Sequence, residues 1–179
     1  THPKAELHIH ELQTVHLLDS LRRGVIDLGL LALPVGSEEF TTESIGLDSF
    51  VLAMSESHPL AKEKSPVKLE VLRDERVILL EEGHCLRDQV TQVCRLVFSE
   101  PSEVQATSMA TLAQMVAAGL GVTLLPECAV KIEAAPGRGI VTRKFVGVPP
   151  NRTVGLVWRK SSPHSRAFTE LAELLTDKK

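Results

Sequence analysis

Residues 81–97, EEGHCLRDQVTQVCRLV, constrain the chain most, because a predicted helix there holds two of its three cysteines apart. Four apolar residues recur at the i, i+4, i+7 and i+11 positions of one helical face: Leu86, Val90, Val93 and Val97. Cys85 and Cys94 are nine residues apart, which in a helix is a rise of about 13.5 Å and a rotation of about 900°. Their sulfurs then lie on opposite sides, whereas a disulfide needs Cα atoms within roughly 7 Å. Either the two cysteines never meet, or their meeting unwinds the helix and is itself a signal.

The two ends of this predicted helix differ chemically. Cys85 follows Gly83 and His84, precedes Arg87, and lies at a helix start; a cationic neighbourhood and free N–H groups favour the reactive thiolate. Cys94 borders the apolar face, where a thiol behaves as a small, inert hydrophobe. A sensor that forms a sulfenic acid and then a disulfide needs such an accessible cysteine and a protected partner. The plainer alternative is two unremarkable cysteines on a helix.

Composition excludes several classes of function. The 179 residues allow one domain or two small lobes, and a net charge of −3 with a pI of about 6.2 leaves no basic surface for gripping nucleic acid. Three cysteines without framework spacing suit a reducing cytoplasm. No signal peptide or apolar run of transmembrane length appears, so we predict a cytoplasmic protein with no membrane contact.

Strands and helices are expected to alternate, which predicts an α/β fold with mostly parallel sheets. Expected strands cover 5–11, 25–33, 43–47, 50–61, 76–82, 103–108, 122–127, 137–145 and 152–160, and expected helices cover 13–23, 85–97, 109–121 and 162–179. The first strand, helix and buried strand would form a βαβ unit. His8 and His10 would face solvent, because no third metal ligand is indicated. Cys128 is expected only to pack, since its sequence neighbours offer no charged activator.

Two longer motifs carry a resemblance to a known family. ELQTVHLLDSLRRGVIDLGLLAL and MATLAQMVAAGLGVTLLPE resemble segments of LysR-type transcriptional regulators, and the resemblance covers essentially the whole chain. It implies a regulatory (effector) domain of two Rossmann-like lobes, similar to type 2 periplasmic binding proteins. Lobe I would comprise residues 1–49 and 155–179, and lobe II, with the redox cysteines, residues 50–154. GHCLRDQ with a second cysteine nine residues after the first resembles the family's hydrogen peroxide sensors.

The resemblance implies a role for each candidate residue. Cys85 resembles the peroxidatic cysteine and Cys94 the resolving one, with Gly83, His84 and Arg87 around the reactive sulfur and Asp88 holding the loop in its reduced form. Thr14 would present its hydroxyl to peroxide, and Arg152 would lie close to the cysteine loop. By itself, Thr14 also suits a helix N-cap, and Arg152 a surface charge before a strand.

The chain departs from the family at its start. Family members carry a winged helix-turn-helix domain, a linker helix and the first strand and helix of lobe I before this point, so we expect lobe I to be incomplete. Promoter DNA would be bound only through that missing domain. The resemblance implies a homodimer of effector domains, a tetramer of the whole regulator, resetting by a thiol reductant such as glutaredoxin, and no cofactor or metal.

The sequence therefore predicts a redox switch and not an enzyme, with two alternatives left open. One is an effector domain that binds a small metabolite between the lobes. The other is a thiol peroxidase, which the absence of a thioredoxin-like CxxC motif disfavours. A zinc site from His84, Cys85 and Cys94 is disfavoured as well, because two cysteines on opposite sides of a helix cannot bind one ion.

Overall fold

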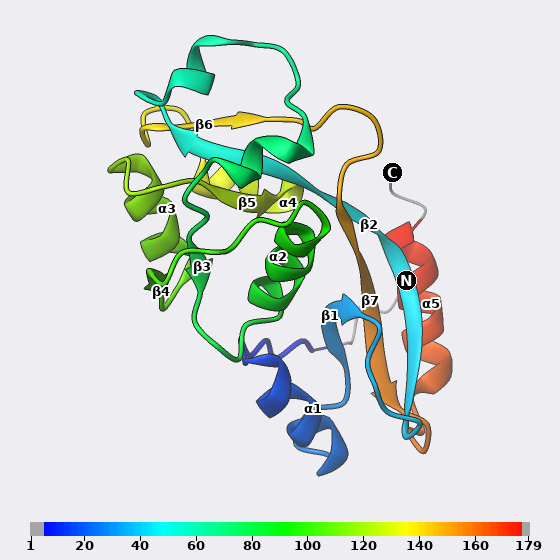
Figure 1. The fold of residues 1–179 in the computed structure, drawn as a ribbon. Helices are drawn as coiled ribbons and strands as arrows, with labels where there is room; N and C mark the ends of the chain where they lie inside the picture. The colour runs from blue at the N-terminus through cyan, green and yellow to red at the C-terminus, as the bar shows by residue number, and fades with distance from the viewer. Residues whose placement is uncertain (1–5, 177–179) are drawn as a thin grey trace.

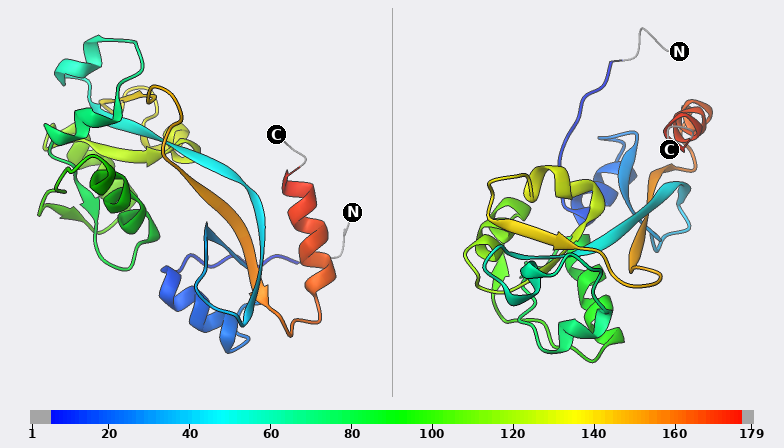
Figure 2. Two further views of the ribbon diagram at one scale, coloured as in Figure 1. Left: turned by 45° about the vertical axis from the view of Figure 1, so that its right-hand side comes forward. Right: turned by 90° about the horizontal axis from the view of Figure 1, so that it is seen from above.

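The computed structural model describes residues 6–176, which form two groups of elements joined by two long strands (Figure 1). The main sheet has the order β1-β7-β2-β5, and β6 also pairs with β2. We call lobe I the elements around β1, and lobe II those around β5 and β6. The left view in Figure 2 shows the two lobes apart, with β2 and β7 running between them.

Lobe I is a sheet covered by one helix on each face. Its elements are α1 (Thr14–Arg22), β1 (Gly29–Leu33), α5 (Ser165–Thr176), the first half of β2 (Phe40–Ser55) and β7 (Asn151–Arg159). Alternate residues of a strand point to opposite faces. Val157 accordingly packs with Leu17 and Leu21 of α1, whereas Leu156 and Trp158 pack with Ala172 of α5.

Lobe II surrounds the second half of β2 in the same manner. Phe50, Leu52 and Met54 face a core that includes helix α2, and Val51 and Ala53 face the core beneath α3. Its remaining elements are η1 (Pro59–Lys62), η2 (Leu69–Arg73), β3 (Leu79–Leu80), α2 (Cys85–Leu96), β4 (Gln105–Ala106), α3 (Met109–Ala117), β5 (Thr123–Pro126), α4 (Glu127–Glu133) and β6 (Ile140–Arg143). Both faces of this half of β2 are buried, which explains its continuous apolar sequence.

The helix predictions are confirmed. Helix α2 buries Leu86, Val90, Val93 and Cys94, and Val97 beyond its end is buried too. Helix α3 begins after Ser108, whose hydroxyl accepts a hydrogen bond from the Thr111 N–H at 3.1 Å. This is the expected N-cap. Helix α5 is shorter than predicted and begins at Ser165.

Four expected strands differ from the structure. Residues 6–11 of the expected strand 5–11 form no strand and are exposed, with His8 and His10 in solvent as expected, whereas residue 5 lies outside the described range. The strands expected at 43–47 and 50–61 are one strand, β2, that ends at Ser55. The strand expected at 25–33 begins only at Gly29, so the described residues form no βαβ unit.

Strand direction also differs from the prediction. Every pairing between strands of the main sheet is antiparallel, whereas β3 pairs with β4 in parallel and two isolated bridges, Val67 with Phe145 and Val77 with Val122, are parallel as well. The reason is the return path of the chain: β2 leaves lobe I and β7 comes back beside it in the opposite direction. The α/β class is correct, but the mostly parallel pairing is not. Within residues 6–176, no helix has the length and apolar character needed to cross a membrane.

Candidate functional site

Cys85 is the first residue of helix α2 and is half-buried. It follows a loop, residues 81–84, that connects β3 to α2. The first N–H groups of a helix have no partner within the helix, so the Cys85 sulfur lies where the backbone favours negative charge. His84 is the N-cap residue, and its side chain makes no capping hydrogen bond. The predicted position of Cys85 at a helix start is confirmed.

Cys94 lies in the opposite environment on the same helix. It is fully buried in the lobe II core, and burial raises the pKa of its thiol, against the lowering effect of a hydrogen bond with Ser99. A raised pKa keeps this sulfur neutral, so it is a poor nucleophile in the folded protein. The helix separates the two cysteines, and both are free thiols.

Glycine at position 83 brings the cysteine loop against lobe I. Its φ of +93° is unfavourable for other residues, and a Cβ there would lie 3.0 Å from Oε1 of Gln13. Gln13 is the N-cap residue of α1, without a side-chain capping bond, and Thr14 is the first residue of that helix. The N-cap position considered for Thr14 is therefore occupied by Gln13, the residue before it. The half-buried Thr14 follows directly on Gln13, and Figure 1 shows the start of α1 beside the loop between β3 and α2.

Arg87 fixes the cysteine loop from the other side. Its Nη1 donates a hydrogen bond to the carbonyl oxygen of Leu80 at 2.9 Å, which spans the loop from the first turn of α2 to the end of β3. The Arg87 N–H also donates to the His84 carbonyl at 3.0 Å. Asp88 is exposed in the first turn of α2, where a carboxylate is favourable to a helix N-terminus. A role for Gly83, His84 and Arg87 around the Cys85 sulfur stays a prediction.

Arg152 lies on β7 and makes its contacts where this strand pairs with β2 between the two lobes. It donates to Oδ2 of Asp48, its direct cross-strand partner, from Nε at 3.1 Å and from Nη2 at 2.9 Å, and Nη2 lies 3.7 Å from the Cys128 sulfur. The Cys128 thiol also donates to Asp48 Oδ2 at 3.1 Å. The expectation that Cys128 has no charged neighbour is wrong, because tertiary contacts bring both groups to it. A contact of Arg152 with the cysteine loop stays a prediction.

Gln89 is a residue that the sequence reasoning did not select. Its Oε1 is buried and has no hydrogen-bond partner within the described part of the chain. Gln89 follows Cys85 by four residues, so the two side chains share one face of α2. The signal available in the sequence was this spacing within GHCLRDQ. An unpartnered buried acceptor is suited to a small hydrogen-bond donor.

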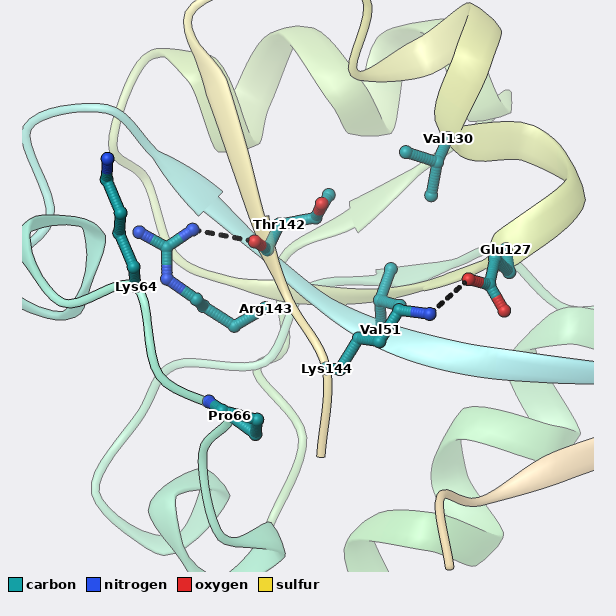
Figure 3. Close-up of a pocket in the computed structure, with 8 residues that line it drawn as sticks. All are labelled: Val51, Lys64, Pro66, Glu127, Val130, Thr142, Arg143 and Lys144. Carbon is teal, nitrogen blue, oxygen red and sulfur yellow. Dashed lines mark hydrogen bonds and ion pairs between the residues drawn. The ribbon is translucent and has the colours of Figure 1, made fainter. Parts of the chain in front are cut away.

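Two hollows of the surface lie away from these residues. One of about 400 Å³ is lined by Lys64, Arg143 and Lys144 among others (Figure 3), but Lys144 pairs with Glu127 at 2.9 Å and Arg143 donates to backbone carbonyls, including that of Ala61. A largely apolar hollow of about 1490 Å³ lies between residues 6–12, the 25–30 segment and α5. Neither contains a predicted site residue. Among residues 6–176, no cluster of three or more His, Cys, Asp or Glu side chains could hold a metal ion.

Comparison with known proteins identifies the family. The whole chain, residues 1–179, matches the LysR substrate binding domain, and the chain belongs to that family. It is 42% identical over 175 residues to a probable hydrogen peroxide-inducible genes activator of Mycobacterium avium, covering 97% of this chain and 56% of that protein. It is 40% identical over 176 residues to the DNA-binding transcriptional dual regulator OxyR of Escherichia coli, covering 98% and 57%.

A solved structure agrees in fold. The H2O2-bound form of a cysteine-to-serine mutant of Corynebacterium glutamicum OxyR superposes with a TM-score of 0.89 at 36% identity, covering 98% of this chain and 56% of that one. Within the LysR family, the chain is therefore similar to the regulatory part of OxyR-like hydrogen peroxide-inducible activators. It spans little more than half the length of these relatives, which are transcription regulators and not enzymes. The predicted family and fold class are confirmed.

Proposed function

We propose that this chain senses hydrogen peroxide through Cys85 and signals through a Cys85–Cys94 disulfide. The observation that carries the proposal is the contrast between the two sulfurs on one helix: Cys85 is partly accessible at the start of α2, and Cys94 is fully buried nine residues later. The similarity to hydrogen peroxide-inducible activators, one of them solved with H2O2 bound, supports the same reading.

The first step is attack of the Cys85 thiolate on one oxygen of peroxide. The sulfur–oxygen bond forms as the oxygen–oxygen bond breaks, so thiolate and H2O2 give sulfenic acid and hydroxide. His84 and Arg87 supply positive charge or hydrogen bonds for the leaving hydroxide, and the Thr14 hydroxyl donates to the peroxide from lobe I. Gln89 Oε1 is an acceptor for a peroxide O–H on the same helix face. Arg152, on β7, contributes its positive charge to the stabilisation of the leaving hydroxide.

The second step joins the sulfenic acid to Cys94 and releases water. Both sulfurs lie on one helix, so its turns between residues 85 and 94 must unwind before the bond can form. Asp88 and the Arg87–Leu80 hydrogen bond stabilise the reduced arrangement that has to open. When the helix unwinds, some side chains of α2 become exposed and others become buried. This changes the surface that the chain presents to a second copy of itself.

We divide the lobes into residues 1–49 with 155–179 and residues 50–154. Residues 40–49 of β2 pair with β7, whereas Phe50 is the first residue to pair with β5, which supports the boundary after residue 49. The strand pairing gives no such support to the boundary after residue 154, because β7 pairs with lobe I strands from Asn151 onward. In the complete regulator, we place dimerisation and tetramer formation on these domains and promoter binding on a separate DNA-binding domain. A cytoplasmic thiol reductant such as glutaredoxin would return the disulfide to two thiols.

Peptide mapping after a brief, near-stoichiometric peroxide pulse tests this function. Trypsin places the three cysteines in separate peptides, residues 77–87, 88–95 and 96–131, so each sulfur is read independently. We expect a loss of two hydrogens located to a link between the first two peptides, and no link in Cys85→Ser. In Cys94→Ser, a dimedone adduct should mark the sulfenic acid at Cys85.

Two results would overturn the proposal. Oxidation that falls equally on Cys85 and Cys128 would remove the selectivity that a sensor needs. A Cys85 that stays reduced would favour a family member that binds a metabolite, which stabilisation of the protein by a small ligand without any redox response would then support. Continuous consumption of peroxide with a thiol reductant would instead indicate a thiol peroxidase.

A further inference from the structure

The Cys128 side chain is exposed, but its sulfur contacts two charged side chains. It lies at the start of α4, in lobe II, where two groups from β2 and β7 reach it. Asp48 accepts from the Cys128 N–H with Oδ1 at 3.1 Å and from the Cys128 thiol with Oδ2 at 3.1 Å. Arg152 reaches the same sulfur at 3.7 Å while it is paired to Asp48 at 2.9 Å. The carboxylate therefore touches both the thiol and the cation.

The two charged groups act on this sulfur in opposite directions. A guanidinium beside a thiol favours the thiolate, which is the form that attacks peroxide, whereas a carboxylate that accepts the S–H bond favours the thiol. Partial burial and then the hydrogen bond and charge of Asp48 raise the pKa of Cys128, in opposition to Arg152. Asp48 is itself well buried, with only 10% of its side chain exposed, so solvent does little to weaken its effect.

We propose that Asp48 is a specificity-determining residue that confines peroxide oxidation to Cys85. It holds the Cys128 thiol as a hydrogen-bond donor and engages Arg152, which would otherwise be an unpaired cation beside an exposed sulfur. Without Asp48, Cys128 would compete for peroxide by the same chemistry as Cys85: thiolate and H2O2 would give sulfenic acid and hydroxide. The inference rests on the proposed function only in naming Cys85 as the intended target.

The test measures how fast iodoacetamide alkylates Cys128, read from the 96–131 peptide at neutral pH. Asp48→Asn keeps an oxygen for the Cys128 N–H but removes the negative charge, and we expect alkylation about tenfold faster than in the unchanged protein. In Asp48→Asn with Arg152→Gln, the rate should fall below that of Asp48→Asn, because the activating cation is gone as well.

The matched control is Glu43→Gln. Glu43 is an exposed acid on the same strand, roughly 17 Å from Asp48 along β2, and its replacement removes the same charge. Its Cys128 rate should not change. An equal rate in Asp48→Asn and Glu43→Gln would overturn the proposal, as would a fast rate that persists in the double variant.

A second measurement requires no substitution and covers a variant that fails to fold. In the unchanged protein, Cys128 should alkylate more slowly than the same residue in the urea-unfolded chain at the same pH, although it is exposed in the fold. A native rate equal to or above the unfolded rate would refute the role of Asp48. A failure of Cys85 to react with peroxide appears in the 77–87 peptide, so the two proposals can fail separately.

Discussion

The stability of helix α2 should set the rate at which the disulfide forms. Gln92 is exposed on α2 between the two cysteines, so its replacement alters helix propensity with little effect on the core. Glycine is about 1 kcal/mol less favourable than alanine inside a helix. If the turn at Gln92 is fully open in the rate-limiting step, this difference is worth about a fivefold change in rate. Gln92→Gly should therefore form the disulfide up to about fivefold faster than Gln92→Ala.

The side chains that α2 buries in the core limit how much apolar surface the opened helix can leave exposed to solvent. Leu86, Val90 and Val93 are 5%, 2% and 6% exposed, and full exposure of three such side chains costs roughly 5–9 kcal/mol. That cost is comparable to the whole stability of a small domain. The oxidised chain is therefore expected to bury these three side chains again in a new arrangement, instead of leaving them in solvent.

Rapid mixing with one equivalent of peroxide, followed by quenching and mass spectrometry, separates the two steps. Sulfenic acid at Cys85 should appear at the same rate in both Gln92 variants, because the substitution lies two turns from the reactive sulfur. The link between peptides 77–87 and 88–95 should then grow faster in the glycine variant. Equal growth in the two variants would refute the idea that opening of α2 limits the reaction.

Three further outcomes are expected from the site geometry. Gly83→Ala should lower the free energy of unfolding in urea by about 1 kcal/mol because φ is +93°, whereas Gly36→Ala, in open space without a positive φ, should not. Arg87→Met should cost roughly 1.5–3 kcal/mol through the lost hydrogen bond to a backbone carbonyl, and the exposed Arg95→Met should cost less than 0.5 kcal/mol. Burial raises the pKa of Cys94, so under reducing conditions stability should fall as pH rises above about 8.5, where the unfolded thiol ionises first, and Cys94→Ala should reduce that slope.

Local patterns predicted helices α1, α2, α3 and α5, because their signals are contained in a few turns of sequence, but they did not predict α4. The apolar period from Leu86 to Val97 located α2, and Ser108 marked the start of α3. The strands were less predictable, because a strand exists only where a partner pairs with it. Residues 6–11 alternate like a strand without pairing to one, and β2 continues past Gly46 because β7 lies beside it across a register shift.

The reactive helix of the candidate site was accessible to sequence reasoning, but the groups brought to it from afar were not. Cys85, Cys94 and their neighbours are close in sequence, so their placement follows from one helix. Asp48 is 80 residues from Cys128, and Arg152 is 24 residues from it. No pattern in a single sequence reveals such a contact, which is why Cys128 was expected to lack charged neighbours.

The pairing of β2 with β7 limits how the two lobes can move. A two-stranded ribbon twists and bends readily, but sliding one strand by a single residue would turn every side chain to the wrong face of the sheet. The register therefore allows the ribbon to twist but not to slide, so we expect the angle between the lobes to change more readily than their separation. A disulfide formed on α2 would accordingly change the angle between the lobes more than the distance between them. A gene regulator built on this domain would then respond to that angle.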